Sequence, residues 1–344
     1  MNDNTTQGLS GSADISILLP VYEAEDTIAS CLRSIERQTY TRWKCFIVND
    51  GSNDKSLEIA EEFALRDSRF HIINREHRGI VFALNEGLNQ IDTEFTARMD
   101  ADDVMHRHRL AEQAAYLRSH PGITAVGCQV RIFPRNGLGP GLREYESWLN
   151  NRLDYKSIYT DAFVECPIAH PTLCIRTNEL RSFGYRHTSW AEDYDLILRL
   201  LVAKKKIESI PKRLLIWRNG PKRLSKTDSR CSIDQFLTCK ATYLCEDFLK
   251  THKDYILWGY GKTGRKLAKE LQKLGRSPKY IVDIHTGRIG NKIMGVPVVA
   301  PNEIGDLPNI PLIVSVAREI PRNEARKILD SFARKELVDF ICTA

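Results

Sequence analysis

The N-terminal part of the chain alternates between short apolar runs and amphipathic segments, and this alternation limits the fold more than any other feature. Apolar runs of strand length indicate strands at residues 15–21, 44–49, 70–74 and 94–99. Between them, apolar residues recur at helical spacing over residues 27–38, 55–66 and 80–90. Strands that alternate with helices predict an α/β fold in which helices cover both faces of a mainly parallel sheet. Ligands of such sheets bind at the carboxyl ends of the strands, so we expect a site there.

A cluster of aspartates follows the fourth expected strand, in the order Asp100, Ala101, Asp102 and Asp103. Because a single residue separates Asp100 from Asp102, an extended turn allows both carboxylates to reach one ion. Hard oxygen ligands of this kind suit Mg²⁺ or Mn²⁺. Such an ion would bridge the two phosphates of a nucleoside diphosphate and neutralise the charge of a leaving diphosphate. For so short a motif, a turn that caps the next helix is the alternative.

The first two expected strands also end in residues suited to binding a nucleotide. Asp50 ends the second strand, where its carboxylate can accept a hydrogen bond from a base, although strand-to-helix turns favour aspartate anyway. The first strand ends in Pro20, Val21, Tyr22 and Glu23. Tyr22 can stack on a base or flank it, and a tyrosine at the edge of the core is the alternative.

Composition and charge exclude several classes of protein. Of the 344 residues, 42% are hydrophobic, which is enough to form a core without disulfides. The nine cysteines are odd in number and include no CxxC pair, which indicates free thiols in a reducing compartment and no zinc site. The net charge of +6 is mild for a nucleic-acid-binding protein, so we expect no nucleic-acid partner. No apolar run approaches the roughly 20 residues that span a bilayer, so we expect a cytoplasmic protein.

The chain is expected to divide into two domains joined by a helix. Residues 1–13 are polar, lack the pattern of a signal peptide and are expected to be disordered. Residues 14–226 are expected to form the larger domain, and residues 227–251 a connecting helix. Residues 252–344 are expected to form a small Rossmann-like α/β domain. Within the larger domain, the sequence GLGPG at residues 137–141 predicts a loop.

A glycine turn marks the expected C-terminal domain. Gly259, Gly261 and Gly264 follow an expected strand and open a helix, and Asp283 comes about 20 residues later. This context is typical of a dinucleotide-binding turn, in which backbone N–H groups approach a phosphate. However, the unit has only about half the length of a full dinucleotide domain. We therefore favour an architectural or partner-docking role, do not expect bound NAD(P), and leave a nucleotide site at this turn open.

The positive charge between residues 204 and 226 surrounds a short apolar segment at residues 214–217. One interpretation is peripheral contact with an anionic membrane at its inner face, or with a lipid-phosphate acceptor. The alternative is a solvated face beside a buried strand. The sequence leaves a homo-oligomer open.

The chain resembles the family 2 glycosyltransferases with the GT-A fold in a series of segments over about residues 14–225. The segments are ISILLPVYEAEDTIASCLRSIERQTY, CFIVNDGSNDKS, HRGIVFALNEGL, RMDADD, HPT, WAEDYDLILRL and LLIWR. The resemblance implies inverting transfer of a sugar from a UDP-sugar to a hydroxyl of a carbohydrate or lipid-linked acceptor, in polysaccharide or glycoconjugate synthesis. The two-domain layout is also similar to beta-1,3-N-acetylglucosaminyltransferase-like proteins, which makes UDP-GlcNAc a candidate donor.

The same resemblance assigns roles to individual positions. A donor-binding role is implied for Pro20, Val21, Tyr22, Glu23, Asp50, Arg78, Asp100, Ala101 and Asp102. Within that set, Asp50 would bind the base, and Asp102 and Asp100 would be the metal ligands. Asp193 would be the catalytic base, because inversion requires deprotonation of the acceptor hydroxyl opposite the leaving group. Many relatives have a histidine where this chain has Gly220, so the third metal ligand is open, with His170 as a candidate.

Three other functions compete with this interpretation. A sugar nucleotidyltransferase would need a glycine-rich, basic loop after the first strand, whereas residues 22–26 are mostly acidic. An NAD(P)- or nucleotide-binding oxidoreductase would use the C-terminal glycine turn and leave the aspartates without a role. A non-catalytic sugar-nucleotide-binding protein remains open because the histidine is missing.

Overall fold

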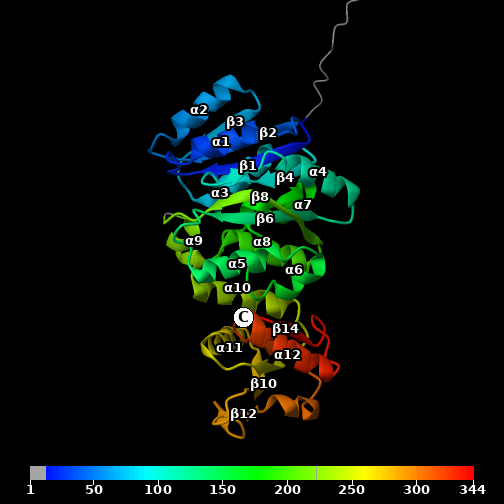
Figure 1. Cartoon of the computed structure of the whole chain (residues 1–344). Coiled ribbons are helices and arrows are strands. Elements are labelled where there is room, and N and C mark those ends of the chain that lie inside the picture. Colours follow the sequence, from blue (N-terminus) through cyan, green and yellow to red (C-terminus); the bar gives the residue numbers. More distant parts are fainter. Residues whose placement is uncertain (1–12, 222) are drawn as a thin grey trace, which may run out of the picture. The chain divides into compact units, whose positions relative to one another are not determined.

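A computed structural model describes residues 13–221 and 223–344 of the chain. All but the last residue of the predicted disordered segment, residues 1–13, lie outside these ranges. The chain forms two compact units. Among the described residues, the N-terminal unit comprises residues 13–151, Ala169–Tyr185 and Ser209–Asn219, and the C-terminal unit comprises Arg152–Ile168, Arg186–Glu208, 220–221 and 223–344. Figure 1 labels many of the elements of both units. The predicted domain boundaries remain a prediction.

The N-terminal unit is built on a mixed sheet with the strand order β3-β2-β1-β4-β7-β6-β8-β5. Its strands are β1 (Ile15–Val21), β2 (Trp43–Asp50), β3 (Phe70–Arg75), β4 (Phe95–Arg98), β5 (Val104–Met105), β6 (Ala125–Phe133), β7 (Cys174–Arg176) and β8 (Ile207–Arg218). Strands β3, β2, β1 and β4 pair in parallel, as the sequence predicts. The pairs β4–β7, β6–β7 and β5–β8 are antiparallel.

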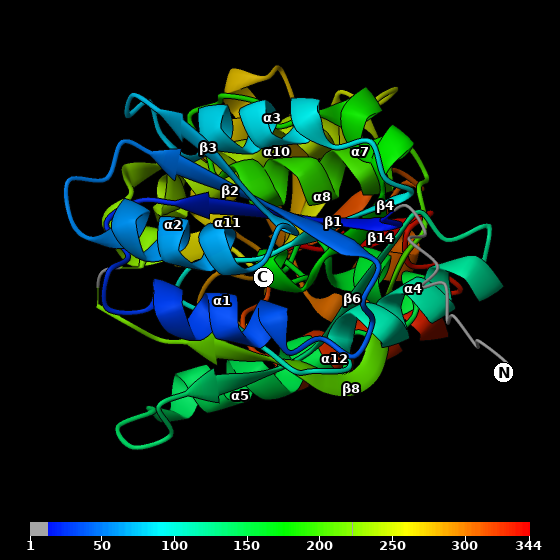
Figure 2. The ribbon, with the colours of Figure 1, turned by 90° about the horizontal axis from the view of Figure 1, so that it is seen from above.

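Helices cover both faces of the parallel strands. The helical elements of this unit are α1 (Ile28–Glu36), α2 (Ser56–Arg66), α3 (Ile80–Gln90), α4 (Arg109–Ser119), α5 (Pro140–Asn150), η1 (His170–Thr172) and α7 (Thr177–Phe183). Figure 2 shows α3 on one face of β1–β3 and α1 and α2 on the other. Helix α3 packs very closely, since a Cβ added to Gly87 would lie 2.4 Å from Leu18 Cδ1.

The order of the parallel strands creates a ligand-binding edge. The chain runs from β1 to β2 to β3 and then returns to β4, which pairs with the opposite side of β1. The carboxyl ends of β1 and β4 therefore flank the point at which the strand order reverses, where open α/β sheets bind ligands. This arrangement brings the loops that begin at Tyr22 and Asp100 to the same edge of the sheet.

The prediction of a loop at residues 137–141 is wrong at its end, because α5 begins at Pro140. Proline suits the first position of a helix, because its ring fixes φ near the helical value. The N–H that proline lacks would have no partner within the helix at this position, so no hydrogen bond is lost. The Pro-Gly pair therefore begins a helix here and does not prevent one.

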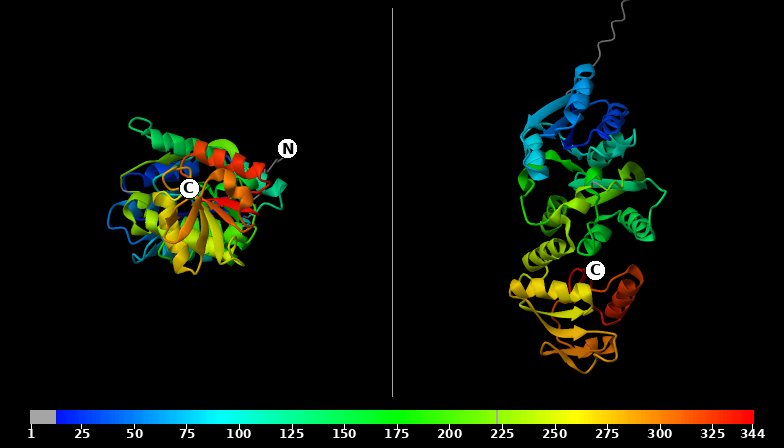
Figure 3. Two further views of the ribbon diagram at one scale, coloured as in Figure 1. Left: turned by 90° about the horizontal axis from the view of Figure 1, so that it is seen from below. Right: turned by 90° about the vertical axis from the view of Figure 1, so that its left-hand side faces the viewer.

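The C-terminal unit contains a second sheet with the order β11-β12-β10-β9-β13-β14. Its strands are β9 (Asp254–Trp258), β10 (Ser277–Val282), β11 (Lys292–Ile293), β12 (Val296–Val299), β13 (Leu312–Val314) and β14 (Phe340–Cys342). All neighbours are parallel except β11 and β12. Its helical elements are α6 (Tyr155–Asp161), α8 (Glu192–Val202), α9 (Leu224–Thr227), η2 (Ser229–Cys231), α10 (Ile233–Glu246), α11 (Lys262–Lys273), η3 (Pro301–Asp306) and α12 (Glu319–Ser331). Right-handed crossovers toward opposite edges put α11 and α12 on opposite faces of this sheet (Figure 3).

Candidate active site

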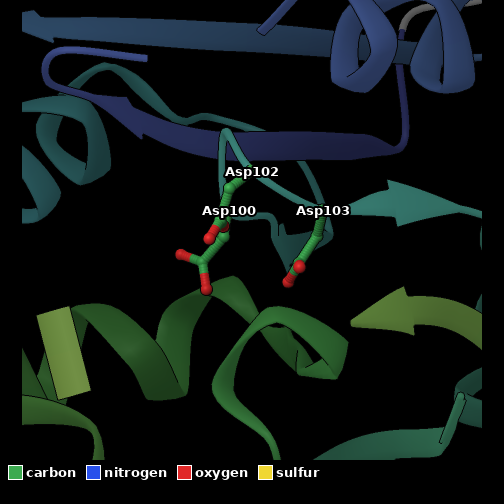
Figure 4. Close-up of side chains that lie close together, drawn as sticks. All are labelled: Asp100, Asp102 and Asp103. Carbon is green, nitrogen blue, oxygen red and sulfur yellow. The ribbon is translucent and has the colours of Figure 1, made fainter. Parts of the chain in front are cut away.

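Three carboxylates converge on the loop after β4. Figure 4 shows Asp100, Asp102 and Asp103 on this loop with their side chains extending to the same side. One carboxylate oxygen of each lies within 4.8 Å of the others. Two ligands of one ion can be separated by about this distance, since Mg²⁺, Mn²⁺ and Ca²⁺ bind oxygen at roughly 2.0–2.6 Å. The spacing and the all-oxygen donor set therefore fit a divalent cation.

A buried arginine fixes Asp100. Arg98 ends β4, and its Nη2 lies 2.6 Å from Asp100 Oδ1. Its side chain is 3% exposed, whereas that of Asp100 is 26% exposed. From α1, the Cys31 thiol donates a hydrogen bond to the Asp100 carbonyl oxygen at 3.4 Å. The side chain of Asp100 is thus held by Arg98, and its backbone is held by Cys31.

Arg218 at the end of β8 holds the other side of the loop. Its backbone N–H donates to Asp103 Oδ1 and its Nε donates to the Asp102 carbonyl oxygen, each at 2.7 Å. Asp103 is fully buried. Asp103 therefore belongs to the cluster, as the sequence predicts, and its short bond to Arg218 gives it a positioning role. The contact of Asp103 with β8 was not predictable from the sequence.

The carboxylate of Asp50 is buried and organises the turn after β3. Its Oδ1 accepts hydrogen bonds from Arg75 Nη1 at 2.6 Å and from the Arg78 N–H at 3.1 Å. Its Oδ2 accepts from the Gly79 N–H at 2.8 Å and lies 3.0 Å from His77 Nδ1. The predicted contact between Asp50 and a base remains a prediction, and the carboxylate already has four partners in the protein.

The loops after β1 and β2 are joined by hydrogen bonds. Glu23 has a positive φ of 48°. Its N–H donates to Ser52 Oγ at 3.1 Å, and its Oε1 accepts from the Asn53 N–H at 2.8 Å. The Ala24 N–H donates to Ser56 Oγ at 2.7 Å. The carboxylate of Glu23 therefore connects two loops of the predicted nucleotide pocket.

An exposed aromatic side chain lies beside this pair of loops. Tyr22 is 47% exposed. One face of its ring stacks on His77, with a centroid distance of 4.1 Å and an interplanar angle of 26°. The Arg78 guanidinium lies over the Phe82 ring, 4.3 Å from its centroid. The remaining predicted donor-binding residues in this unit are less exposed: Pro20 is half-buried, and Val21 and Ala101 are buried.

His170 has a structural environment. It is buried, and its Nε2 lies 3.0 Å from the Tyr185 hydroxyl. The backbone of Tyr185 is in turn held by Asn85, which accepts from its N–H at 3.0 Å and donates to its carbonyl oxygen at 2.8 Å. Burial, together with the charge of Arg98, lowers the pKa of His170 well below its usual 6.5. The imidazole is therefore neutral near pH 7 and contacts a tyrosine.

Asp193, the predicted catalytic base, belongs to the C-terminal unit. It lies in the first turn of α8, is half-buried, and accepts a hydrogen bond from the Tyr194 N–H at 2.6 Å. Its acidic neighbours are paired with arginines: Glu192 lies 3.4 Å from Arg230, and Asp195 lies 2.7 Å from Arg199. The helix N-terminus favours the charged form of a carboxylate at this position.

Glu165 is a second carboxyl group in the electrostatic environment of Asp193. Burial raises the pKa of Glu165, and the negative charge of Asp193 acts in the same direction, whereas the buried Lys240 opposes both. The sequence offered no signal for Glu165, because it falls between regular patterns. A carboxyl with a raised pKa near a candidate base is a feature of acid–base sites.

A cavity of about 1010 Å³ opens in the N-terminal unit beside β5 and β8. Val104, Met105 and Leu215 contribute apolar lining, and none of the described lining residues is acidic. The cavity is also lined by exposed arginines, which are Arg33, Arg37, Arg107, Arg131 and Arg213. Among the residues the structure describes, no helix combines the length and apolar character needed to cross a bilayer.

The fold is of the GT-A type, and the chain is similar to known glycosyltransferases. The family model "Glycosyl transferase family 2" matches residues 16–179 of the chain. Bifunctional glycosyltransferase pgtA of Dictyostelium discoideum is 28% identical over 240 residues, which cover 57% of this chain and 31% of that protein. Amylovoran biosynthesis glycosyltransferase AmsE of Erwinia amylovora is 28% identical, with coverages of 61% and 78%. In O-antigen biosynthesis glycosyltransferase WbnJ of Escherichia coli, 28% identity extends over 69% of this chain and 89% of the relative.

Solved structures agree with the fold. S. aureus TarS in complex with UDP-GlcNAc has a TM-score of 0.55 at 17% identity, covering 75% of this chain and 71% of that one. The mannosyltransferase PcManGT from Pyrobaculum calidifontis, in complex with GDP-Man and Mn²⁺, has a TM-score of 0.50 at 19% identity, with coverages of 77% and 70%. For three curated relatives, the matched region spans only 31%, 66% and 58% of the relative's own length.

Proposed function

We propose that the chain transfers a sugar from a UDP-sugar to an acceptor hydroxyl, with a divalent cation and with inversion at the anomeric carbon. The observation that carries this proposal is the group of three carboxylates at the ligand-binding edge, with oxygens within 4.8 Å of one another. The solved neighbours support a nucleotide-sugar donor, since one contains UDP-GlcNAc and another contains GDP-Man with Mn²⁺. UDP-GlcNAc is therefore the first donor to test.

In this proposal, Asp100 and Asp102 hold Mg²⁺ or Mn²⁺, and Arg98 keeps the Asp100 carboxylate oriented. A bound cation would supply the positive charge that stabilises the leaving diphosphate. Tyr22 offers an exposed ring to the base. Asp50 maintains the turn that contains Arg78, and its carboxylate accepts a hydrogen bond from the base.

Asp193 acts as the general base. Its carboxylate takes the proton of the acceptor hydroxyl while the oxygen of that hydroxyl forms a bond to the anomeric carbon. The bond to the diphosphate breaks on the opposite face of the sugar, and the diphosphate leaves with the bonding electrons. The configuration at the anomeric carbon is therefore inverted, as in other direct displacements.

A donor screen with the full chain tests the proposal. Hydrolysis of UDP-, GDP- and dTDP-sugars is measured with Mn²⁺, with Mg²⁺ and with EDTA. We expect metal-dependent hydrolysis of a UDP-sugar, a loss of about 100-fold or more in Asp102→Ala, and full activity in the exposed control Asp92→Ala. Asp193→Asn should lower transfer to an acceptor by about 100-fold or more. Activity that persists in EDTA, or at the normal rate in Asp102→Ala, refutes the mechanism.

We further propose a carbohydrate or lipid-linked acceptor, in polysaccharide or glycoconjugate synthesis, and peripheral contact with an anionic membrane. The names of AmsE and WbnJ, which refer to amylovoran and O-antigen biosynthesis, support the first part. The arginine-lined cavity supports the second, because its lining joins cationic and apolar side chains.

A further inference from the structure

The sheet of the C-terminal unit has its own point of strand reversal. The chain runs from β9 to β10 to β12 toward one edge, and β13 and β14 then extend the sheet from the other side of β9. Gly259 follows β9 and Ser315 follows β13, so these two residues flank the reversal point. In open parallel sheets, ligands bind in the crevice at this point. The family model ends at residue 179, before β9, and does not cover the sheet of this unit.

Two glycines bring the N-terminus of α11 close to the strand ends. Gly259 has a φ of 96°, and a Cβ on it would lie 2.7 Å from the Ser315 carbonyl oxygen. A Cβ on Gly264 would lie 2.0 Å from the Gly259 carbonyl oxygen. Close packing is therefore a sufficient reason for glycine at both positions.

Gly261 differs from these two glycines. It is the N-cap residue of the 12-residue helix α11, has a φ of −75°, and has no side chain to cap the helix. A Cβ on Gly261 would meet no atom within 4 Å among the described residues. Packing therefore does not explain a glycine here. Gly261 directly precedes the first N–H groups of α11, which favour an anion.

The Ser315 hydroxyl is the second, independent observation. Ser315 is 5% exposed, and its Oγ has no hydrogen-bond partner among the residues described. Its Cβ lies 3.4 Å from the point that a Cβ on Gly264 would occupy, so the side chain lies against the glycine turn. A buried hydroxyl without a partner destabilises a fold, and a ligand oxygen at the turn would provide the partner.

An ion pair follows the end of β10. Asp283 is buried, accepts from the His285 N–H at 2.9 Å, and accepts from Arg288 Nη1 at 2.8 Å. In dinucleotide-binding sheets, an acid at this position contacts the ribose and an arginine nearby accommodates a phosphate. In this chain, Asp283 forms an ion pair with Arg288, whose side chain is 41% exposed.

We propose that the turn from Gly259 to Gly264, together with Ser315 and Arg288, forms a second nucleotide site that binds the diphosphate of a nucleoside diphosphate. Ser315 and the N-terminus of α11 contact the diphosphate, and Arg288 lies toward the ribose. This chemistry is shared by UDP, UDP-sugars and nicotinamide dinucleotides, and the site is separate from the aspartate cluster of the N-terminal unit.

Calorimetric titration of the full chain in EDTA tests the proposal, with UDP, UDP-GlcNAc, NADH and NADPH as separate probes. The tightest binder identifies the source of the diphosphate. The variants are Gly261→Glu, which adds a carboxylate at the helix N-terminus and whose Cβ would meet no atom within 4 Å among the described residues, and Ser315→Ala. The matched control is Gly122→Glu in the N-terminal unit, where a Cβ also meets nothing within 4 Å.

We expect Gly261→Glu to weaken binding by at least about tenfold and Gly122→Glu to leave it unchanged. Ser315→Ala should weaken binding about three- to tenfold without lowering the melting temperature, since it removes a hydroxyl with no partner in the free protein. The difference between wild type and Gly261→Glu isolates this site, whatever the aspartate cluster binds. The proposal is overturned if no probe binds up to about 1 mM, or if wild type and Gly261→Glu bind equally. A Ser315→Ala variant that melts earlier but binds normally also overturns it.

Discussion

Replacing Asp50 by asparagine measures how much the N-terminal unit depends on one buried carboxylate. The side chains of Asp50 and Arg75 are 4% and 7% exposed, and their atoms are 2.6 Å apart. Removing one partner of a buried ion pair costs about 3–5 kcal/mol. Arg75 keeps a second partner, because its Nε lies 2.8 Å from Glu86. We therefore expect a loss at the lower end, about 3 kcal/mol.

Urea unfolding followed by tryptophan fluorescence gives the readout. With a slope of about 2 kcal/mol per molar urea, the midpoint of the N-terminal unit should fall by about 1.5 M. The control is Asp92→Asn, whose partner Lys44 is 3.6 Å away and whose side chain is 71% exposed. Exposed pairs contribute about 0–1 kcal/mol, so its midpoint should move by less than about 0.5 M. If Asp50→Asn shifts as little as the control, the reasoning is refuted, and a loss of UDP affinity at unchanged stability would assign the carboxylate to the base.

Three further predictions concern the N-terminal unit. In co-sedimentation, the full chain should bind anionic vesicles and not zwitterionic ones. Replacing Arg37 and Arg213 by glutamate should weaken binding to anionic vesicles at least about 25-fold, because each arginine contributes about 1 kcal/mol. Equal binding to both kinds of vesicle would contradict the proposed membrane contact. Burial lowers the pKa of His170 below 6.5, so its contribution to stability is present above pH 6.5 and is lost as the pH falls. Between about pH 7 and pH 5, the urea midpoint should therefore fall less in His170→Gln than in the wild type, and an equal fall in both would contradict this prediction. Gly87→Ala should destabilise the unit by about 1–3 kcal/mol, because the added Cβ would lie 2.4 Å from Leu18 Cδ1; an unchanged melting temperature would mean that α3 can move away from the sheet.

Local periodicity was sufficient to predict the parallel half of the N-terminal sheet. The expected strand at residues 15–21 coincides with β1, and the expected helix at residues 80–90 coincides with α3. The aspartate cluster was also predictable, since a strand end and three acids are both local signals. The seven-residue helices α6 and α7 were not predicted, because their apolar faces are too brief to show a period. Helix α5 was missed because the Pro-Gly pair near its start suggested a loop.

The contacts that hold the site were beyond the reach of the sequence. Arg218 contacts Asp102 and Asp103 from more than 100 positions away in the sequence. Arg75 reaches Asp50 from the neighbouring strand β3, 25 positions away. Such pairs depend on strand order and register, which a local pattern does not contain. The unpartnered hydroxyl of Ser315 is likewise visible only when β13 is placed beside β9.

The ion pair between Arg98 and Asp100 has a consequence for turnover under the proposed function. Because the guanidinium offsets one of the three negative charges on the loop, the loop alone attracts a dication less strongly than three unpaired carboxylates would. The phosphates of the donor would supply the missing attraction. Asp100 and Asp102 would then hold a dication firmly only while a diphosphate shares it, so loss of the nucleoside diphosphate after transfer would free the loop for the next cycle.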